Sequence, residues 1–121
     1  MLFEISATRH FAAAHQIRLY DGSLEPLHGH NWKVVVRVAA DKLDEIGVVM
    51  DFHALDGLLG EITSPMHNSN LNDHPAFSSA NPTTENVAFH IAGNLKLPEK
   101  VRLTSVEVWE TPENSVVYRP R

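Results

Sequence analysis

The first fifteen residues alternate between apolar and polar side chains, and this pattern constrains the fold more than any other feature of the chain. Successive side chains of a β-strand point to opposite faces, so residues two apart share a face. One parity carries mostly apolar side chains, namely Phe3, Ile5, Ala7, Phe11, Ala13 and His15. The pattern therefore predicts a strand over 2–15 that turns this parity toward the core and ends at His15.

A second strand is predicted over 31–40, where the sequence NWKVVVRVAA is rich in valine. Asp21-Gly22-Ser23 marks a turn before it. The connection between the two strands is of moderate length, and we expect them to pair antiparallel. In that arrangement the end of the first strand lies beside the start of the second.

The next segments predict a helix followed by an irregular loop. Asp51 is suited to cap a helix over 51–62. The apolar residues of this helix fall on one face, as Phe52, Leu55, Leu58, Leu59 and Ile62. Residues 64–79 are polar and contain two prolines, so we expect a loop there.

A second helix is predicted to start within Asn81–Glu85, with Pro82 at the first helical position and Glu85 in the first turn. Its buried stripe consists of Ala88, Ile91, Ala92 and Leu95, and Pro98 ends it. Strands over 101–110 and 115–119 follow, separated by a turn. The order ββααββ predicts an α+β domain spanning 1–121, a four-stranded antiparallel sheet with two helices on one face.

Composition excludes several classes of function. Ten Lys and Arg residues stand against 15 Asp and Glu residues, so no basic patch is available to bind nucleic acid. The chain has no cysteine, which excludes disulfides and thiolate zinc sites. The N-terminal sequence MLFEISATRH has neither a basic region nor a long apolar run. We therefore expect no signal peptide, no membrane span and a cytoplasmic location.

Three of the eight histidines are placed to form a metal site. His28 and His30 flank Gly29 just before the second strand, and residues two apart in an extended chain point to one side. Antiparallel pairing would bring His15 close to both. Three neutral imidazoles bind Zn²⁺ and leave one coordination position open for a substrate. The alternative interpretation is that they are surface or hydrogen-bonded core histidines.

Glu110 is an unexpected residue at the end of a buried strand face. It follows Val106 and Val108 on the same parity, where an apolar side chain is expected. A buried carboxylate needs a partner, and a ligand with adjacent N–H donors is one that it binds well. Alternatively, the side chain turns into solvent at the end of the strand.

Several motifs in order resemble one known family, that of the 6-pyruvoyltetrahydropterin synthases and 6-carboxytetrahydropterin synthases. The motifs are Phe11-Ala12-Ala13-Ala14-His15, Leu27-His28-Gly29-His30-Asn31-Trp32, Val49-Met50-Asp51-Phe52, Leu71-Asn72-Asp73, Asn81-Pro82-Thr83-Thr84-Glu85-Asn86 and Trp109-Glu110-Thr111. Together they extend over nearly the whole chain.

The resemblance implies the tunnelling fold, or T-fold, and assembly into trimers that stack as hexamers, with active sites between subunits. It implies that His15, His28 and His30 bind zinc and that Glu110 anchors the pterin ring of a dihydropterin substrate. It also implies that Thr84 and Glu85 contribute to substrate binding.

Two family positions carry other residues in this chain. The usual cysteine base is replaced by Leu24, and the usual Asp-His relay by His67 and Asn68. Glu25, in the pattern Glu-x-Leu-His-Gly-His, resembles a variant group in which a glutamate replaces the cysteine. That group cleaves dihydroneopterin to 6-hydroxymethyl-dihydropterin. The resemblance thus implies Glu25 as the base, with His67 as an acid or an assistant to the base.

Three hypotheses follow. The first is a zinc-dependent pterin lyase that acts on the side chain of 7,8-dihydroneopterin or its triphosphate. The second is 6-carboxy-5,6,7,8-tetrahydropterin synthesis for the queuosine and deazaguanine pathway, with a rearranged base. The third belongs to another class: a paralogue that binds a pterin or a metal without catalysis.

Overall fold

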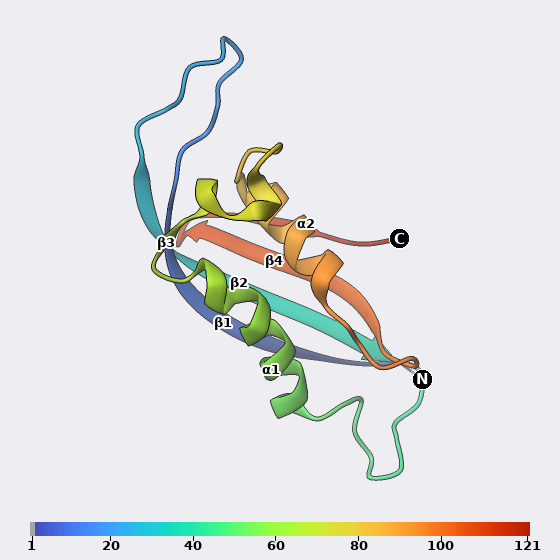
Figure 1. Ribbon diagram of the computed structural model, residues 1–121. Coiled ribbons are helices and arrows are strands. Elements are labelled where there is room, and N and C mark those ends of the chain that lie inside the picture. The colour runs from blue at the N-terminus through green and yellow to red at the C-terminus, as the bar shows by residue number, and fades with distance from the viewer. Residues whose placement is uncertain (1) are drawn as a thin grey trace.

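Among residues 2–121, which this computed structural model describes, five strands form one mixed sheet and two α-helices cover one of its faces (Figure 1). The strand order is β3-β1-β2-β4-β5. The elements are β1 (Phe3–His15), β2 (His28–Ala40), α1 (Phe52–Thr63), β3 (Ser69–Asn70), α2 (Thr84–Asn94), β4 (Arg102–Thr111) and β5 (Asn114–Tyr118). The predicted α+β class is confirmed. No helix within the same residues is long and apolar enough to cross a membrane.

β1 and β2 pair antiparallel over their full lengths, as predicted. The register aligns Phe3 with Ala40 at one end of the ladder and His15 with His28 at the other. Ala13 lies opposite His30. Residues 16–27, which join the two strands, project beyond the sheet (Figure 1). The pairing therefore gathers the three histidines at the end of the sheet from which this loop projects.

The sheet has one strand more than the four predicted, and it is not wholly antiparallel. β3 pairs parallel with residues 13–14 of β1, within a segment predicted to be an irregular loop. Asn68, with φ of 57°, turns the chain just before it, and the Asn68 N–H donates to the Ala12 carbonyl at 2.6 Å. A strand of two polar residues is too short to show alternation, which is why the sequence pattern missed it. The same segment contains three 3₁₀ turns, Ser64–Met66, Leu71–Asp73 and Pro75–Phe77.

Side-chain caps set where both helices begin. The Asp51 carboxylate accepts the His53 N–H at 2.9 Å, so the predicted cap of α1 is confirmed. The Thr83 hydroxyl accepts the Asn86 N–H at 3.0 Å and caps α2. Pro82 therefore precedes the cap, and its predicted place at the first helical position was wrong. The threonine hydroxyl satisfies a free N–H group, so the helix starts after it.

The core lies between the helices and one face of the sheet. The predicted inner parity of β1 is confirmed, because Phe11, Ala13 and His15 are buried and the earlier members pack against the core. The central part of the core consists of fully buried apolar side chains, including Trp32, Val34, Val36, Val38, Leu55, Leu59, Ile91, Val106 and Val108. Of these, Trp32 lies at the end of the sheet that carries the histidines, where its ring packs against those of His15 and His30.

One charged residue of β1 attaches the sheet to α1. The Arg9 guanidinium donates to both carboxylate oxygens of Asp56 at 3.0 Å. It lies directly over Gly60, where an added Cβ would stand 2.8 Å from the guanidinium carbon. The absence of a side chain at Gly60 thus leaves room for the paired Arg9 and Asp56.

Candidate metal centre and substrate pocket

The three predicted histidines converge on one point. One nitrogen of each of His15, His28 and His30 lies within 4.8 Å of the other two. Their side chains differ in exposure, which is 2% for His15, 20% for His30 and 41% for His28. The centre is therefore closed on the core side and open toward solvent beside His28.

Backbone carbonyls orient two of the rings. His15 Nδ1 donates to the Pro82 carbonyl, and His28 Nδ1 donates to the Pro26 carbonyl, both at 2.8 Å. A carbonyl only accepts hydrogen bonds, so in each ring the hydrogen lies on Nδ1. Nε2 is then left with a free lone pair that faces the cluster. A second hydrogen bond of this kind is what fixes metal-binding histidines in proteins.

The chemistry of the donor set fits a metal ion. The Nε2 atoms of His15 and His30 are buried and have no hydrogen-bond partner among residues 2–121. A buried polar atom without a partner is unfavourable, and a bound cation would satisfy both nitrogens. Burial, with smaller effects of the neighbouring His15 and His28, outweighs the opposing effect of the Glu110 and Glu25 carboxylates and holds the pKa of His30 below its ordinary value. Its ring is therefore neutral at pH 7, the form that ligates a metal.

Glu110 reaches the same cluster from β4. Its Oε1 lies 3.3 Å from His15 Nε2, and its Oε2 lies 3.8 Å from His30 Nε2. The Thr84 hydroxyl donates to Oε1 at 3.1 Å. Glu110 lies at the register shift between β4 and β5, which falls between Trp109 and Thr111. The prediction that this parity of β4 faces inward is confirmed, and Glu110 is partly buried rather than fully turned into solvent.

Glu25 lies at the exposed side of the centre. Its Oε1 accepts the Ile17 N–H at 3.1 Å and lies 3.9 Å from His28 Nε2. The side chain is 28% exposed. The carboxylate therefore lies at the rim of the three imidazoles, and the role predicted for Glu25 stays a prediction.

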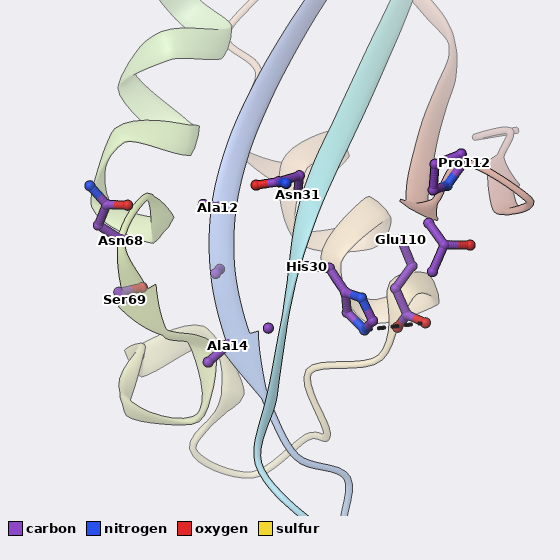
Figure 2. Close-up of a pocket in the computed structure, with 11 residues that line it drawn as sticks. Ala12, Ala14, His30, Asn31, Asn68, Ser69, Glu110 and Pro112 are labelled. Atoms are coloured by element: carbon purple, nitrogen blue, oxygen red, sulfur yellow. Dashed lines mark ion pairs between the residues drawn. The ribbon is translucent and has the colours of Figure 1, made fainter.

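An open pocket of about 630 Å³ adjoins the centre at His30, whereas His15, His28 and Glu25 do not line it. In Figure 2, His30 and Glu110 point toward one another, while Asn68 and Ser69 lie on the opposite side of β1 and β2. The lining residues are Ala12, Ala13, Ala14, Gly29, His30, Asn31, Asn68, Ser69, Glu110, Thr111 and Pro112. The wall is formed largely by small side chains, which leaves the strand ends accessible.

Of the other predicted site residues, one lies at the centre and two are exposed. Thr84 joins the centre through its hydrogen bond to Glu110. Glu85 is exposed in the first turn of α2. His67 is exposed, accepts the Ala12 N–H through Nδ1 at 3.1 Å and does not line the pocket. The roles predicted for Glu85 and His67 stay predictions.

Sequence reasoning missed the groups that support the centre. The carbonyls of Pro26 and Pro82 orient two rings. Asn68 and Ser69 line the pocket. A backbone carbonyl leaves no trace in residue type. For Asn68, the family resemblance marked the position as one of the usual Asp-His relay, but nothing in the residue type placed it at the pocket.

Fold and site together define a class: small α+β proteins in which a three-histidine centre lies at the end of a β-hairpin, beside a pocket with a carboxylate. The comparisons with known proteins agree. The chain matches the 6-pyruvoyl tetrahydropterin synthase family over residues 4–121 and belongs to it. Members of this family are pterin-processing enzymes.

Individual relatives extend this result. The chain is 36% identical over 129 residues to a Bacillus subtilis 6-carboxy-5,6,7,8-tetrahydropterin synthase, covering 98% of this chain and 86% of that protein. It is 33% identical over 108 residues to a Pyrococcus furiosus dihydroneopterin monophosphate aldolase, covering 88% of each. The Caenorhabditis elegans 6-pyruvoyl tetrahydropterin synthase has the same fold, with a TM-score of 0.84 at 22% identity over 100% of this chain and 97% of that one. The predicted T-fold is thereby confirmed.

Proposed function

We propose that this protein is a zinc-dependent lyase that cleaves the side chain of 7,8-dihydroneopterin or a phosphorylated form of it, giving 6-hydroxymethyl-dihydropterin. The observation that carries the proposal is the Glu25 carboxylate, whose Oε1 lies 3.9 Å from His28 Nε2 at the open side of the histidine centre. The aldolase relative from Pyrococcus furiosus supports the same type of carbon–carbon cleavage.

His15, His28 and His30 would hold the metal ion. Zinc in such a site acts as a Lewis acid that polarises the oxygen atoms of a substrate. The hydrogen bonds from His15 and His28 to carbonyls keep their Nε2 atoms free for ligation. Glu110 would bind the edge of the pterin ring, because a carboxylate accepts two parallel N–H bonds.

Glu25 would take the proton from the second hydroxyl of the side chain. The bond between the first and second side-chain carbons then breaks, and the second carbon becomes the carbonyl of glycolaldehyde. The electron pair of the broken bond moves into the pterin ring, and a proton returned to the first carbon completes 6-hydroxymethyl-dihydropterin. A carboxylate performs such a transfer when it is within hydrogen-bond reach of the hydroxyl.

Self-association is part of the proposal. Leu19, Tyr20, Leu24 and Leu27 are large apolar side chains that lie exposed on the projecting loop, and the outer edges of β3 and β5 have no strand beside them among residues 2–121. Such features favour contacts between copies. We propose the trimers or hexamers that the family resemblance implies. His67 would then serve a site on a neighbouring copy, since its own chain does not bring it to the pocket.

The test is incubation of the zinc-loaded protein with 7,8-dihydroneopterin and with its triphosphate separately, followed by mass analysis. Glycolaldehyde with 6-hydroxymethyl-dihydropterin is the expected result from 7,8-dihydroneopterin, and glycolaldehyde triphosphate with the same pterin is the expected result from the triphosphate. Glu25→Gln should abolish turnover and leave the zinc content unchanged, whereas the exposed Glu61→Gln serves as a matched control. Unchanged turnover in Glu25→Gln would exclude Glu25 as the base.

A second candidate is 6-carboxy-5,6,7,8-tetrahydropterin synthesis, favoured by the 36% identity to the Bacillus subtilis enzyme. Release of acetaldehyde and triphosphate would support it in the same assay. Pterin binding without any product would instead support a paralogue that binds but does not react.

A further inference from the structure

Two asparagine side chains hold the chain where it leaves β1. The Asn72 amide accepts the Gln16 N–H at 2.9 Å and donates to the Gln16 carbonyl at 2.8 Å. Asn81 binds Arg18 in the same way, at 2.9 and 3.0 Å. Each amide exchanges two hydrogen bonds with one residue, which is the pattern of a bonded pair in an antiparallel sheet. The two side chains thus take the place of a strand beside residues 16–18.

Glu25 is bound to the residue between these two pairs. Its carboxylate Oε1 accepts the Ile17 N–H at 3.1 Å, and its own N–H donates to the Ile17 carbonyl at 3.0 Å. The same Oε1 atom lies 3.9 Å from His28 Nε2. The position of the carboxylate therefore depends on the position of Ile17, and Ile17 is held from both sides by Gln16 and Arg18.

Asn81 also connects this arrangement to the metal centre. Its carbonyl accepts the Asn86 amide at 2.8 Å, near the start of α2. The next residue, Pro82, accepts His15 Nδ1 at 2.8 Å. One short segment thus orients a metal-binding ring through its backbone and, through its asparagine side chain, the loop that carries Glu25.

We propose that Asn72 and Asn81 are positioning residues that hold the Glu25 carboxylate at the histidine centre. This inference rests on the proposed function, in which Glu25 is the base. Displacing a reacting group by about 1 Å can lower a rate by about 100-fold. Loss of either asparagine should therefore impair the chemical step more than it impairs binding of the pterin or the metal.

The experiment compares Asn72→Ala and Asn81→Ala with wild type, using the zinc-loaded protein. Asn94→Ala is the matched control, because the only side-chain hydrogen bonds of the exposed Asn94 within residues 2–121 go to the half-buried His90 on α2, away from the loop that carries Glu25. Hydrogen exchange at the Ile17 amide should rise about tenfold or more, while the amides of central β2 stay protected. The kcat for 7,8-dihydroneopterin should fall about 100-fold, with KM and zinc content at wild-type values.

Wild-type exchange at Ile17 in both variants would overturn the proposal. So would a rise in KM with unchanged kcat, or a loss of zinc together with loss of protection throughout β1, because either result indicates a different or general structural role. Should an alanine variant fail to fold, the isosteric Asn→Asp variant replaces it, since it keeps the oxygen acceptor and loses the donor. If wild type converts no pterin, the proposed function fails. Hydrogen exchange at Ile17 then decides alone whether the two asparagines hold the loop that carries Glu25.

Discussion

The Oε1 atom of Glu110 lies 3.3 Å from Nε2 of His15. In the neutral His15 ring the hydrogen is used at Nδ1, in the bond to the Pro82 carbonyl, so neither Nε2 nor the ionised Glu110 carboxylate has a hydrogen to donate. Two acceptors this close repel one another unless a cation lies between them. The relationship therefore marks the point where the protein is built to receive positive charge, from a metal or from N–H groups of a ligand.

Replacing Glu110 with Gln should weaken pterin binding and spare the metal. The amide keeps the size of the side chain but loses the charge, and a hydrogen bond to a charged group contributes enough that Kd should rise about tenfold to 100-fold. Fluorescence titration measures Kd, and elemental analysis measures zinc. The exposed Glu113→Gln is the control. An unchanged Kd would remove Glu110 from the binding site.

Replacing any one of the three cluster histidines with Ala should abolish stoichiometric zinc binding, because two imidazoles alone bind the ion far more weakly than three. Zinc should raise the unfolding temperature of wild type and fail to raise that of the variants, since a ligand stabilises only the state that binds it. His53→Ala, on the exposed side of α1, should behave as wild type. Full zinc occupancy in His15→Ala would contradict the assigned centre.

Two glycines of α1 should respond oppositely to alanine. An added Cβ at Gly57 meets nothing within 4 Å, so Gly57→Ala should raise the unfolding free energy by about 0.5–1 kcal/mol. At Gly60 the Cβ would meet the Arg9 guanidinium at 2.8 Å, and the pair with Asp56 must shift. Gly60→Ala should then be less stable than Gly57→Ala by about 1 kcal/mol.

Urea unfolding measures this difference between the two glycine variants. In an Arg9→Ala background it should disappear, because the group that the Gly60 Cβ meets is gone. Persistence of the difference in that background would show that another contact is responsible.

The metal-free protein should lose stability as the pH falls below about 6.5, the ordinary pKa of histidine. Burial, with a smaller effect of the neighbouring His74, lowers the pKa of His90. The unfolded chain therefore takes up its proton at a higher pH than the folded chain does. The contribution of His90 to the unfolding free energy is complete above its pKa in the unfolded chain. It is lost as the pH falls toward its pKa in the folded protein.

Urea unfolding between pH 7.5 and 5.5 measures how steeply the unfolding free energy falls with falling pH. His90→Gln should make this pH dependence less steep, while His53→Gln should leave it as in wild type. Some slope should remain, because the pKa of His30 is lowered too. An identical slope in His90→Gln and wild type would contradict the assignment.

The metal centre could be predicted from sequence because it depends on two local rules. Strand parity places His28 and His30 on one side, and antiparallel pairing brings His15 opposite His28. Each rule follows from a stretch of residues that is visible in the sequence. Glu110 was found by the same reasoning, as a charge on an otherwise apolar strand face.

The groups around the centre could not be found in this way. β3 has only two polar residues, and its pairing with β1 depends on the turn at Asn68. The carbonyl of Pro82 meets His15 across 67 positions of sequence, and a contact of that kind depends on the whole fold. Residue type alone also gave no reason to exclude His67 from the pocket of its own chain.

The thirteen-residue ladder of β1 and β2 makes the spacing of the imidazoles a property of strand pairing. Inserting one residue into either strand would invert the faces beyond the insertion and separate the ligands. Extra residues at the loop tip, within 19–23, would leave the ladder and the carboxylate of Glu25 in place. Chain length can therefore vary at that tip without moving the three imidazoles, so the length of the tip is free to follow whatever surface Leu19 and Tyr20 contact.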